Sequence, residues 1–154
     1  MGGVAPPMSS RLALGFVSAV FLAAGAAKLL DPEAFAFSIE AYRLTPWMLS
    51  VALALYLPCL EILAAVALWV PRLRRGALLL LLALCTLFLA VLGSALARDL
   101  PITCGCLGPG ALPGGLWGSI ALDLCLALTI LYALTRQPAS RDRLPQVPRT
   151  VLFR

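Results

Sequence analysis

Apolar residues dominate long stretches of this chain, and charged residues, proline and glycine separate these stretches from one another. The stretches are Leu12–Leu30, Met48–Val70, Ala77–Ala97 and Leu116–Leu134. A run of about 18 or more apolar residues is long enough to cross the bilayer as a helix, and in lipid a helix satisfies its own backbone hydrogen bonds. The pattern predicts an all-α integral membrane four-helix bundle that occupies residues 1–135.

The connection between the first two spans, DPEAFAFSIEAYRLTP, mixes apolar and polar positions. Asp31 is a favourable N-cap residue, Pro32 suits the first turn of a helix, and Glu33 suits the positive end of the helix dipole. We therefore expect a short helix between spans 1 and 2 that lies at the membrane interface.

Composition and charge support the membrane class and indicate an orientation. Apolar residues make up 62% of the chain and charged residues 12%, whereas soluble domains are about 25% charged. The excess of 12 Lys and Arg over 7 Asp and Glu flanks the spans, so the lipid bilayer rather than nucleic acid is the expected partner. Basic residues favour the cytoplasmic side, and they gather at Arg11, at Arg72, Arg74 and Arg75, and in the C-terminal tail.

This distribution predicts a multi-pass protein of the bacterial inner membrane with both termini in the cytoplasm. The interfacial helix and the connection between spans 3 and 4 are then extracytoplasmic. Residues 136–154, rich in Pro and Arg, are expected to form a disordered basic cytoplasmic tail. A competing interpretation of the first span is a signal peptide, because Arg11 precedes an apolar run that contains small residues; this alternative leaves the later loop on the same side.

The connection between spans 3 and 4, RDLPITCGCLGPGALPGG, holds Cys104 and Cys106 one glycine apart. A disulfide between them is possible where the backbone bends, which Gly105 makes easier. A small strained ring is readily reduced, and exposed strained disulfides are typical of exchange chemistry. The extracytoplasmic space is oxidising, so a redox role for this pair is the favoured interpretation; a static loop staple is the alternative.

The other cysteines, Cys59, Cys85 and Cys125, fall inside the second, third and fourth spans. Counting at 1.5 Å per residue places all of them within a few ångströms of mid-bilayer, where two of them could form an internal thiol pair. Simple packing is the alternative, because cysteine is a small, soft apolar residue. The chain has no histidine, and a pair of cysteines lacks the ligands of a zinc site, so no metal is expected.

Charged residues inside the spans are the remaining anomaly. Glu61 lies near the middle of the second span, where an unpaired carboxylate costs about 3 kcal/mol or more. Counting depths places Lys28 roughly 10 Å or more from Glu61, so an ion pair between them requires offset helices. Lys28, Glu61 and Asp123 either line a polar cavity or bind a polar headgroup, or they fix the register of the bundle through interhelical bonds.

Three segments together resemble the MauE family of methylamine utilisation proteins, related to the DoxX-like proteins: GAAKLLDPEAFAFSIEAYRLTP, LPCLEILAAVAL and RDLPITCGCLG. The resemblance covers roughly residues 12–134, and Lys28, Tyr42, Pro46, Glu61 and the CGCxG at residues 104–108 match the family's pattern. It implies a four-helix membrane protein associated with thiol redox work and with a periplasmic thioredoxin-like partner. In MauE itself that work is the maturation of the disulfide-rich subunit of methylamine dehydrogenase.

The residues and the resemblance together favour thiol-disulfide exchange, with Cys104 and Cys106 as the reacting groups. A thioredoxin-like periplasmic protein is the expected partner. No resident cofactor is indicated, although a quinone or an internal cysteine pair would each serve as electron acceptor or donor. The alternative function is a non-catalytic membrane adaptor, or an assembly or export factor, whose cysteines only brace the loop.

Overall fold

The computed structural model describes residues 8–98 and 115–136, and in this part of the chain every regular element is a helix. The helices are α1 (Met8–Leu30), α2 (Pro32–Ala41), α3 (Trp47–Ala67), α4 (Arg74–Ala97) and α5 (Gly115–Thr135). All but α2 are long and apolar enough to cross a membrane. The prediction of an all-α membrane bundle is confirmed. Cys104, Cys106 and the tail after Arg136 lie outside the described residues.

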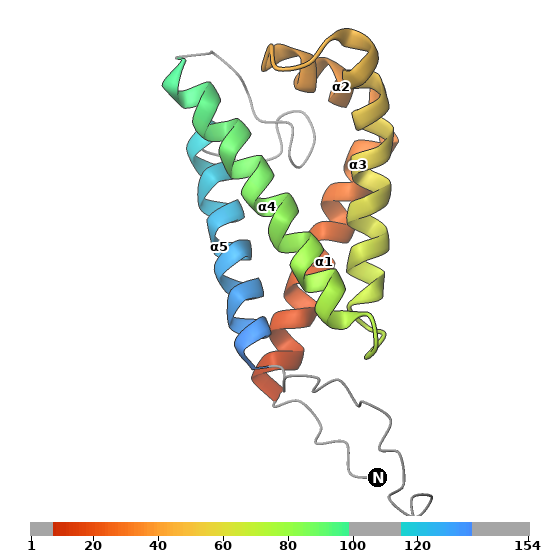
Figure 1. Ribbon diagram of the computed structural model, residues 1–154, viewed down its shortest axis with the longest axis vertical. Coiled ribbons are helices and arrows are strands. Elements are labelled where there is room, and N and C mark those ends of the chain that lie inside the picture. Colours follow the sequence, from red (N-terminus) through yellow and green to blue (C-terminus); the bar gives the residue numbers. More distant parts are fainter. Residues whose placement is uncertain (1–7, 99–114, 137–154) are drawn as a thin grey trace, which may run out of the picture.

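The four long helices run side by side, and α2 crosses one end of the bundle (Figure 1). Helix α1 packs against α3 and α5, and α4 packs against the same two helices. The long helices therefore form a closed ring in the order α1, α3, α4, α5. The start of α1, the α3–α4 turn and the end of α5 share one end of the bundle, and α2 marks the opposite end.

The boundaries of the helices follow from local chemistry. At the start of α2, the Asp31 side chain accepts a hydrogen bond from the amide of Ala34 at 3.0 Å, which confirms the predicted N-cap. The second span was expected to reach Val70, but α3 ends at Ala67. After Ala67 the chain turns ahead of Pro71, which disfavours a helical conformation at Val70, and the Arg74 guanidinium donates to the Leu68 carbonyl at 2.9 Å.

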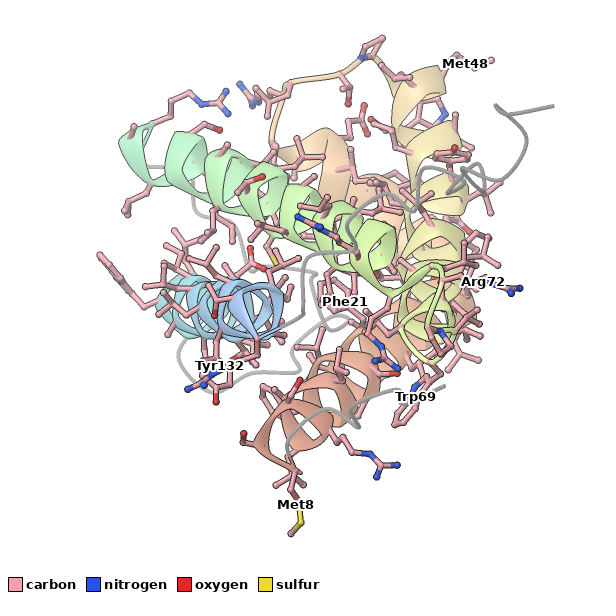
Figure 2. The ribbon with its side chains drawn as sticks, turned by 60° about the horizontal axis from the view of Figure 1, so that its bottom comes forward. Met8, Phe21, Met48, Trp69, Arg72 and Tyr132 are labelled. Atoms are coloured by element: carbon pink, nitrogen blue, oxygen red, sulfur yellow. The ribbon has the colours of Figure 1, made fainter. Side chains whose placement is uncertain are left out.

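The core lies on the inward faces of the four long helices, and large apolar side chains also cover the outward faces. Phe21 lies between the helices, whereas Met8 and Tyr132 project outward (Figure 2). The core consists mainly of small and aliphatic residues, among them Val17, Ala65, Leu78, Leu81 and Ile130. Lipid hydrocarbon can cover an outer surface this apolar, as expected for a bundle that crosses a membrane.

Candidate functional site

The charged residues of α1 and α3 meet inside the bundle. The ammonium of Lys28 donates to Glu61 Oε1 at 2.5 Å, and the two residues are 3% and 0% exposed. This pairing satisfies most of what a buried charge requires, namely an opposite charge with hydrogen-bonding geometry. The depth estimate that kept Lys28 and Glu61 apart is wrong for this bundle.

The physical reason for the error is an offset between α1 and α3. Lys28 lies about 3 Å from the end of α1, whereas Glu61 lies about 21 Å along α3 from Trp47, at 1.5 Å per residue. The two side chains meet because α2 and the turn after it separate the end of α1 from the start of α3. Depths counted from span ends assume that the ends are level, and here they are not.

Close packing of α1 on α3 holds this offset. Gly25 of α1 faces Pro58 and Ile62 of α3, and a Cβ atom at position 25 would lie 2.8 Å from Ile62 Cγ1 and 3.2 Å from the Pro58 carbonyl oxygen. Pro58 itself lacks an amide hydrogen, so it breaks one hydrogen bond of α3 at this level. A glycine opposite a helical proline lets the two backbones approach one turn away from the ion pair.

Aromatic rings enclose the ammonium of Lys28. Its Nζ lies 5.2 Å from the centre of the Phe35 ring in α2 and 4.8 Å from the centre of the Phe88 ring in α4. Both separations are within the range of cation–π attraction, which strengthens when the cation is shielded from water. Three helices besides α1 thus contribute to holding one cation.

Asp123 of α5 joins the pair at a second, smaller cavity. A cavity of about 30 Å³ is lined by side chains of α1, α3, α4 and α5, including Lys28, Glu61, Ser119 and Asp123. Glu61 Oε2 is buried and has no hydrogen-bond partner among the described residues. The structure brings together the intramembrane residues Lys28, Glu61 and Asp123 at one small cavity with a mainly apolar lining. A polar cavity or headgroup site and a role in fixing the bundle register both stay predictions.

The cysteines within the spans are placed differently from one another. Cys85 is buried and its thiol interacts with the Asp123 carboxyl. Cys59 and Cys125 lie on exposed faces of α3 and α5, and all three are free thiols. No disulfide joins them, and an internal relay of thiols stays a prediction. The described residues hold no group of three or more His, Cys, Asp or Glu side chains arranged for a metal ion.

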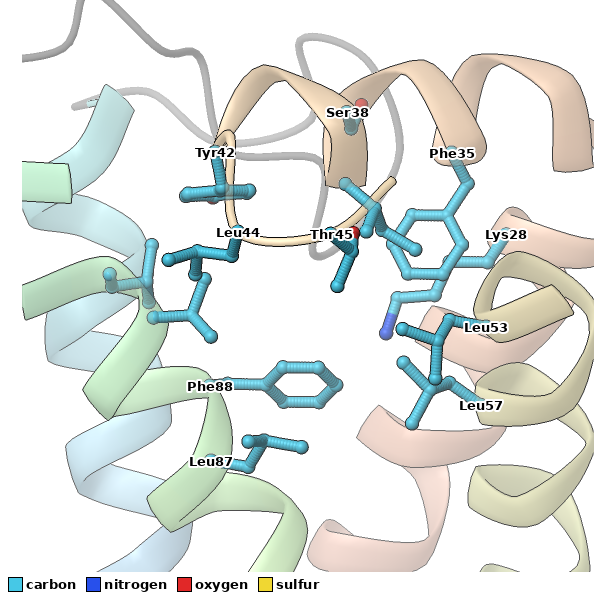
Figure 3. A pocket seen from close by; sticks show the side chains of 13 residues that line it. Lys28, Phe35, Ser38, Tyr42, Leu44, Thr45, Leu53, Leu57, Leu87 and Phe88 are labelled. Atoms are coloured by element: carbon cyan, nitrogen blue, oxygen red, sulfur yellow. The ribbon is translucent and has the colours of Figure 1, made fainter. Parts of the chain in front are cut away.

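A larger cavity of about 290 Å³ lies between α2, α3 and α4. Figure 3 shows the Lys28 ammonium beside Phe35 and Phe88 at one side of it, with Leu53 and Leu57 below Phe35. The lining is almost entirely apolar. Its hydroxyl groups are already engaged, since Ser38 donates to the Ala34 carbonyl at 2.9 Å and Thr45 is bonded to Ser50 at 2.9 Å.

That lining bears on the quinone considered from the sequence. A quinone ring carries carbonyl oxygens on opposite sides, so a matched site offers a donor on each side. This cavity offers the Lys28 ammonium on one side and mainly hydrocarbon elsewhere. The lining of this cavity therefore fits an apolar chain better than it fits a quinone ring. A quinone as electron acceptor or donor stays a prediction.

Sequence reasoning missed several residues of this region. Phe88 and Ser119 are visible in retrospect, because Phe88 follows Cys85 by one helical turn and Ser119 precedes Asp123 by one turn, and such neighbours share a helix face. Phe35 was assigned only to the interfacial helix.

The hydrogen bond from Arg98 to the Tyr42 carbonyl, at 2.8 Å, ties α4 to the turn after α2, and no sequence signal points to it.

Comparison with known proteins agrees with this architecture. A family model described as methylamine utilisation protein MauE matches residues 7–136. The methylamine utilization protein MauE of Paracoccus versutus is 34% identical over 127 residues, which cover 82% of this chain and 68% of that protein. No solved structure matches the chain. A family match over most of the chain, with all four apolar helices inside it, shows that this protein belongs to the MauE family.

Proposed function

We propose that this protein is a membrane component of thiol-disulfide exchange, in which Cys104 and Cys106 react with a periplasmic thioredoxin-like protein. The observation that carries the proposal is the CGC sequence in the connection between α4 and α5 of a MauE family member. Two cysteines one glycine apart form a small strained ring when oxidised, and strained disulfides are the exchanging ones.

The exchange balances without a further reactant. A thiolate of the partner attacks the Cys104–Cys106 disulfide, which breaks that S–S bond and forms a mixed disulfide. The partner's second thiolate attacks the mixed disulfide, so the partner leaves oxidised and this protein keeps two thiols. The reverse sequence oxidises this protein instead, and the attacking species is a thiolate in either direction.

Charge placement supports an extracytoplasmic position for the reacting pair. At the end of the bundle opposite α2 lie Arg11, Arg72, Arg74, Arg75 and Arg136, whereas the end with α2 has Asp31, Glu33 and Glu40 with Arg43 and Arg98. By the positive-inside rule the first end faces the cytoplasm of a bacterial cell. The α4–α5 connection then starts and ends on the periplasmic side.

The name of the Paracoccus versutus relative supports a more specific role. That protein is a methylamine utilization protein, and we extend to this chain a role in the maturation of periplasmic proteins, with methylamine dehydrogenase as a candidate client. The contrasting candidate is an adaptor that docks an assembling partner. Its support is the exposed aromatic pair at the periplasmic end, Phe37 and Trp47, whose ring centres are 5.0 Å apart.

Replacement of both loop cysteines by serine separates the two functions. In cells that carry Cys104→Ser with Cys106→Ser, we expect the periplasmic clients to lose native disulfides while the protein remains inserted in the membrane. The matched control is Cys59→Ser with Cys125→Ser, which removes two cysteines from lipid-facing positions. A single Cys104→Ser or Cys106→Ser variant should trap a mixed disulfide with the thioredoxin-like partner. Unchanged client disulfides in the double variant would favour the adaptor.

A further inference from the structure

The larger cavity, between α2, α3 and α4, plays no part in the proposed thiol chemistry. Its volume is about 290 Å³, and among the described residues that line it Lys28 alone is charged. The hydroxyl groups of Ser38 and Thr45 in its wall are already bonded within the chain. Because a buried water needs two to four polar partners, this wall favours an apolar occupant over water.

The cavity reaches the outer surface of the bundle at the depth of the lipid chains. Two residues that line it, Leu44 and Leu87, are 52% and 49% exposed. Leu87 precedes the end of α4 at Ala97 by about 15 Å, at 1.5 Å per residue, which is well inside a hydrocarbon layer roughly 30 Å thick. The molecules that meet this rim are therefore lipids and solutes dissolved in hydrocarbon.

The volume of the cavity limits the size of its occupant. An apolar cavity of about 150 Å³ in another protein binds one molecule of benzene. By the same proportion, the cavity of about 290 Å³ has room for roughly ten to twelve carbon atoms. That space matches a single chain of medium length and is too small for both chains of a phospholipid.

The Lys28 ammonium points into the cavity and supplies a hydrogen-bond donor. Figure 3 shows it between the rings of Phe35 and Phe88, whose centres lie 5.2 and 4.8 Å from Nζ. An ammonium has three N–H donors, and Glu61 accepts from one of them. A ligand oxygen beside Nζ would accept from another. Because Lys28 and Glu61 form a neutral pair, an uncharged oxygen adds no net charge, whereas a carboxylate would add a charge that is costly at this depth.

The depth of the ammonium excludes a phospholipid headgroup beside it. Its partner Glu61 lies about 21 Å along α3 from Trp47, at 1.5 Å per residue, whereas half of the hydrocarbon layer is roughly 15 Å thick. An oxygen atom bonded to Lys28 is therefore far from the interface, where a phosphate group must stay. A single-chain lipid without a charged headgroup meets this condition.

We propose that this cavity binds one single-chain lipid of about ten to twelve carbon atoms with an uncharged oxygen at its end, as in a medium-chain fatty alcohol. The chain packs against the aromatic rings and against the leucines of α3 and α4, and the oxygen accepts a hydrogen bond from Lys28. Ligand pockets generally combine such apolar walls with a few polar groups that fix orientation. The site does not involve Cys104 or Cys106, so it is tested separately from the exchange reaction.

Photolabelling of the full chain in nanodiscs tests the site. The probe is decanol with a diazirine in the middle of its chain, and peptide mass spectrometry locates the adducts. We expect adducts on residues of the cavity wall such as Leu53 and Val91, and their loss in the presence of excess decanol. At equal concentration in the membrane, decane should compete about tenfold more weakly, because it lacks the oxygen that Lys28 binds.

The same competition defines the results that would overturn the proposal. Adducts spread evenly over the lipid-facing side chains would show that the cavity is no binding site. Equal competition by decane and decanol would remove the role of Lys28. Stronger competition by a decyl-substituted benzoquinone than by decanol would assign the cavity to a quinone instead.

Variants of the wall and of the ammonium make the test specific. Leu53→Trp fills the cavity and should abolish the adducts there, whereas the matched control Leu55→Trp alters a residue of α3 that is 52% exposed and outside the lining. Val91→Trp fills the cavity from α4. Lys28→Met with Glu61→Leu removes the ammonium without leaving an unpaired charge, and should abolish the preference for decanol over decane.

Circular dichroism verifies the helix content of each variant. Unchanged labelling of the cavity wall in both folded tryptophan variants, or a preference for decanol that survives in the folded double variant, would overturn the proposal. The competition in the unaltered protein decides the proposal alone where variants fail to fold.

Discussion

The Lys28–Glu61 pair determines how the bundle tolerates single substitutions within its charged cluster. Both residues are buried and bonded to each other, and breaking such a pair leaves an uncompensated charge, which costs about 3–5 kcal/mol. Replacing both partners by apolar residues removes that penalty. The pair is therefore a strong constraint on position and a weak net source of stability.

We expect Lys28→Met to lower the free energy of unfolding by about 3 kcal/mol, because the buried Glu61 carboxylate is left without its cation. Glu61→Leu should cost less, since Asp123 lines the same cavity and becomes the counter-ion of Lys28. The double variant, Lys28→Met with Glu61→Leu, should recover much of the stability that Lys28→Met alone loses. Unfolding in mixed detergent micelles, followed by circular dichroism, measures all three, with exposed Arg72→Met as the control. Additive losses in the double variant would contradict coupling between the two residues.

At the scale of elements, the fit of α1 against α3 depends on one missing side chain. A Cβ atom at Gly25 meets Ile62 at 2.8 Å and the Pro58 backbone oxygen at 3.2 Å. The Ile62 side chain can rotate, but the Pro58 carbonyl belongs to the helix itself. Gly25→Ala therefore pushes the helices apart near the level at which Lys28 must reach Glu61.

Gly25→Ala should destabilise the bundle by about 1–3 kcal/mol, the usual cost of overpacking. Gly15→Ala is a matched control in the same helix, since a Cβ atom there meets nothing within 4 Å. Combining Gly25→Ala with Ile62→Ala removes the closer contact and should restore part of the loss. Equal stability of the Gly25→Ala and Gly15→Ala variants in the same detergent titration would show that the close approach is unimportant.

The elements were largely predictable from sequence, whereas their relative positions were not. Apolar length locates each span to within a few residues, because transfer of a helix into lipid depends on composition and length alone. The offset of α1 against α3 depends on tertiary contacts such as Gly25 on Pro58, which no single-helix pattern encodes. Consequently the candidate residues Lys28, Glu61 and Asp123 were identifiable, but their convergence on one cavity was not. The Cys104–Cys106 pair lies outside the described residues and stays a prediction.

At the scale of the whole molecule, the ring of four helices separates two chemically different ends. One end gathers arginines from the start of α1, the α3–α4 turn and the end of α5, and the other carries α2 with its acidic residues. Each span carries the chain to the other side of the membrane. Once the side of one connection is known, the side of every other connection between the four described spans follows. The proposed thiol chemistry requires the end with α2 to face the periplasm.

Labelling of single introduced cysteines tests this orientation. In a background whose native cysteines are replaced by serine, Glu40→Cys lies at an exposed position of α2 and Arg72→Cys lies in the exposed α3–α4 turn. A thiol reagent that cannot cross the bilayer should label Glu40→Cys in intact spheroplasts, and Arg72→Cys only after permeabilisation, because arginine-rich connections stay in the cytoplasm. Labelling in the opposite order would place the α4–α5 connection in the reducing cytoplasm, where a strained disulfide would not persist.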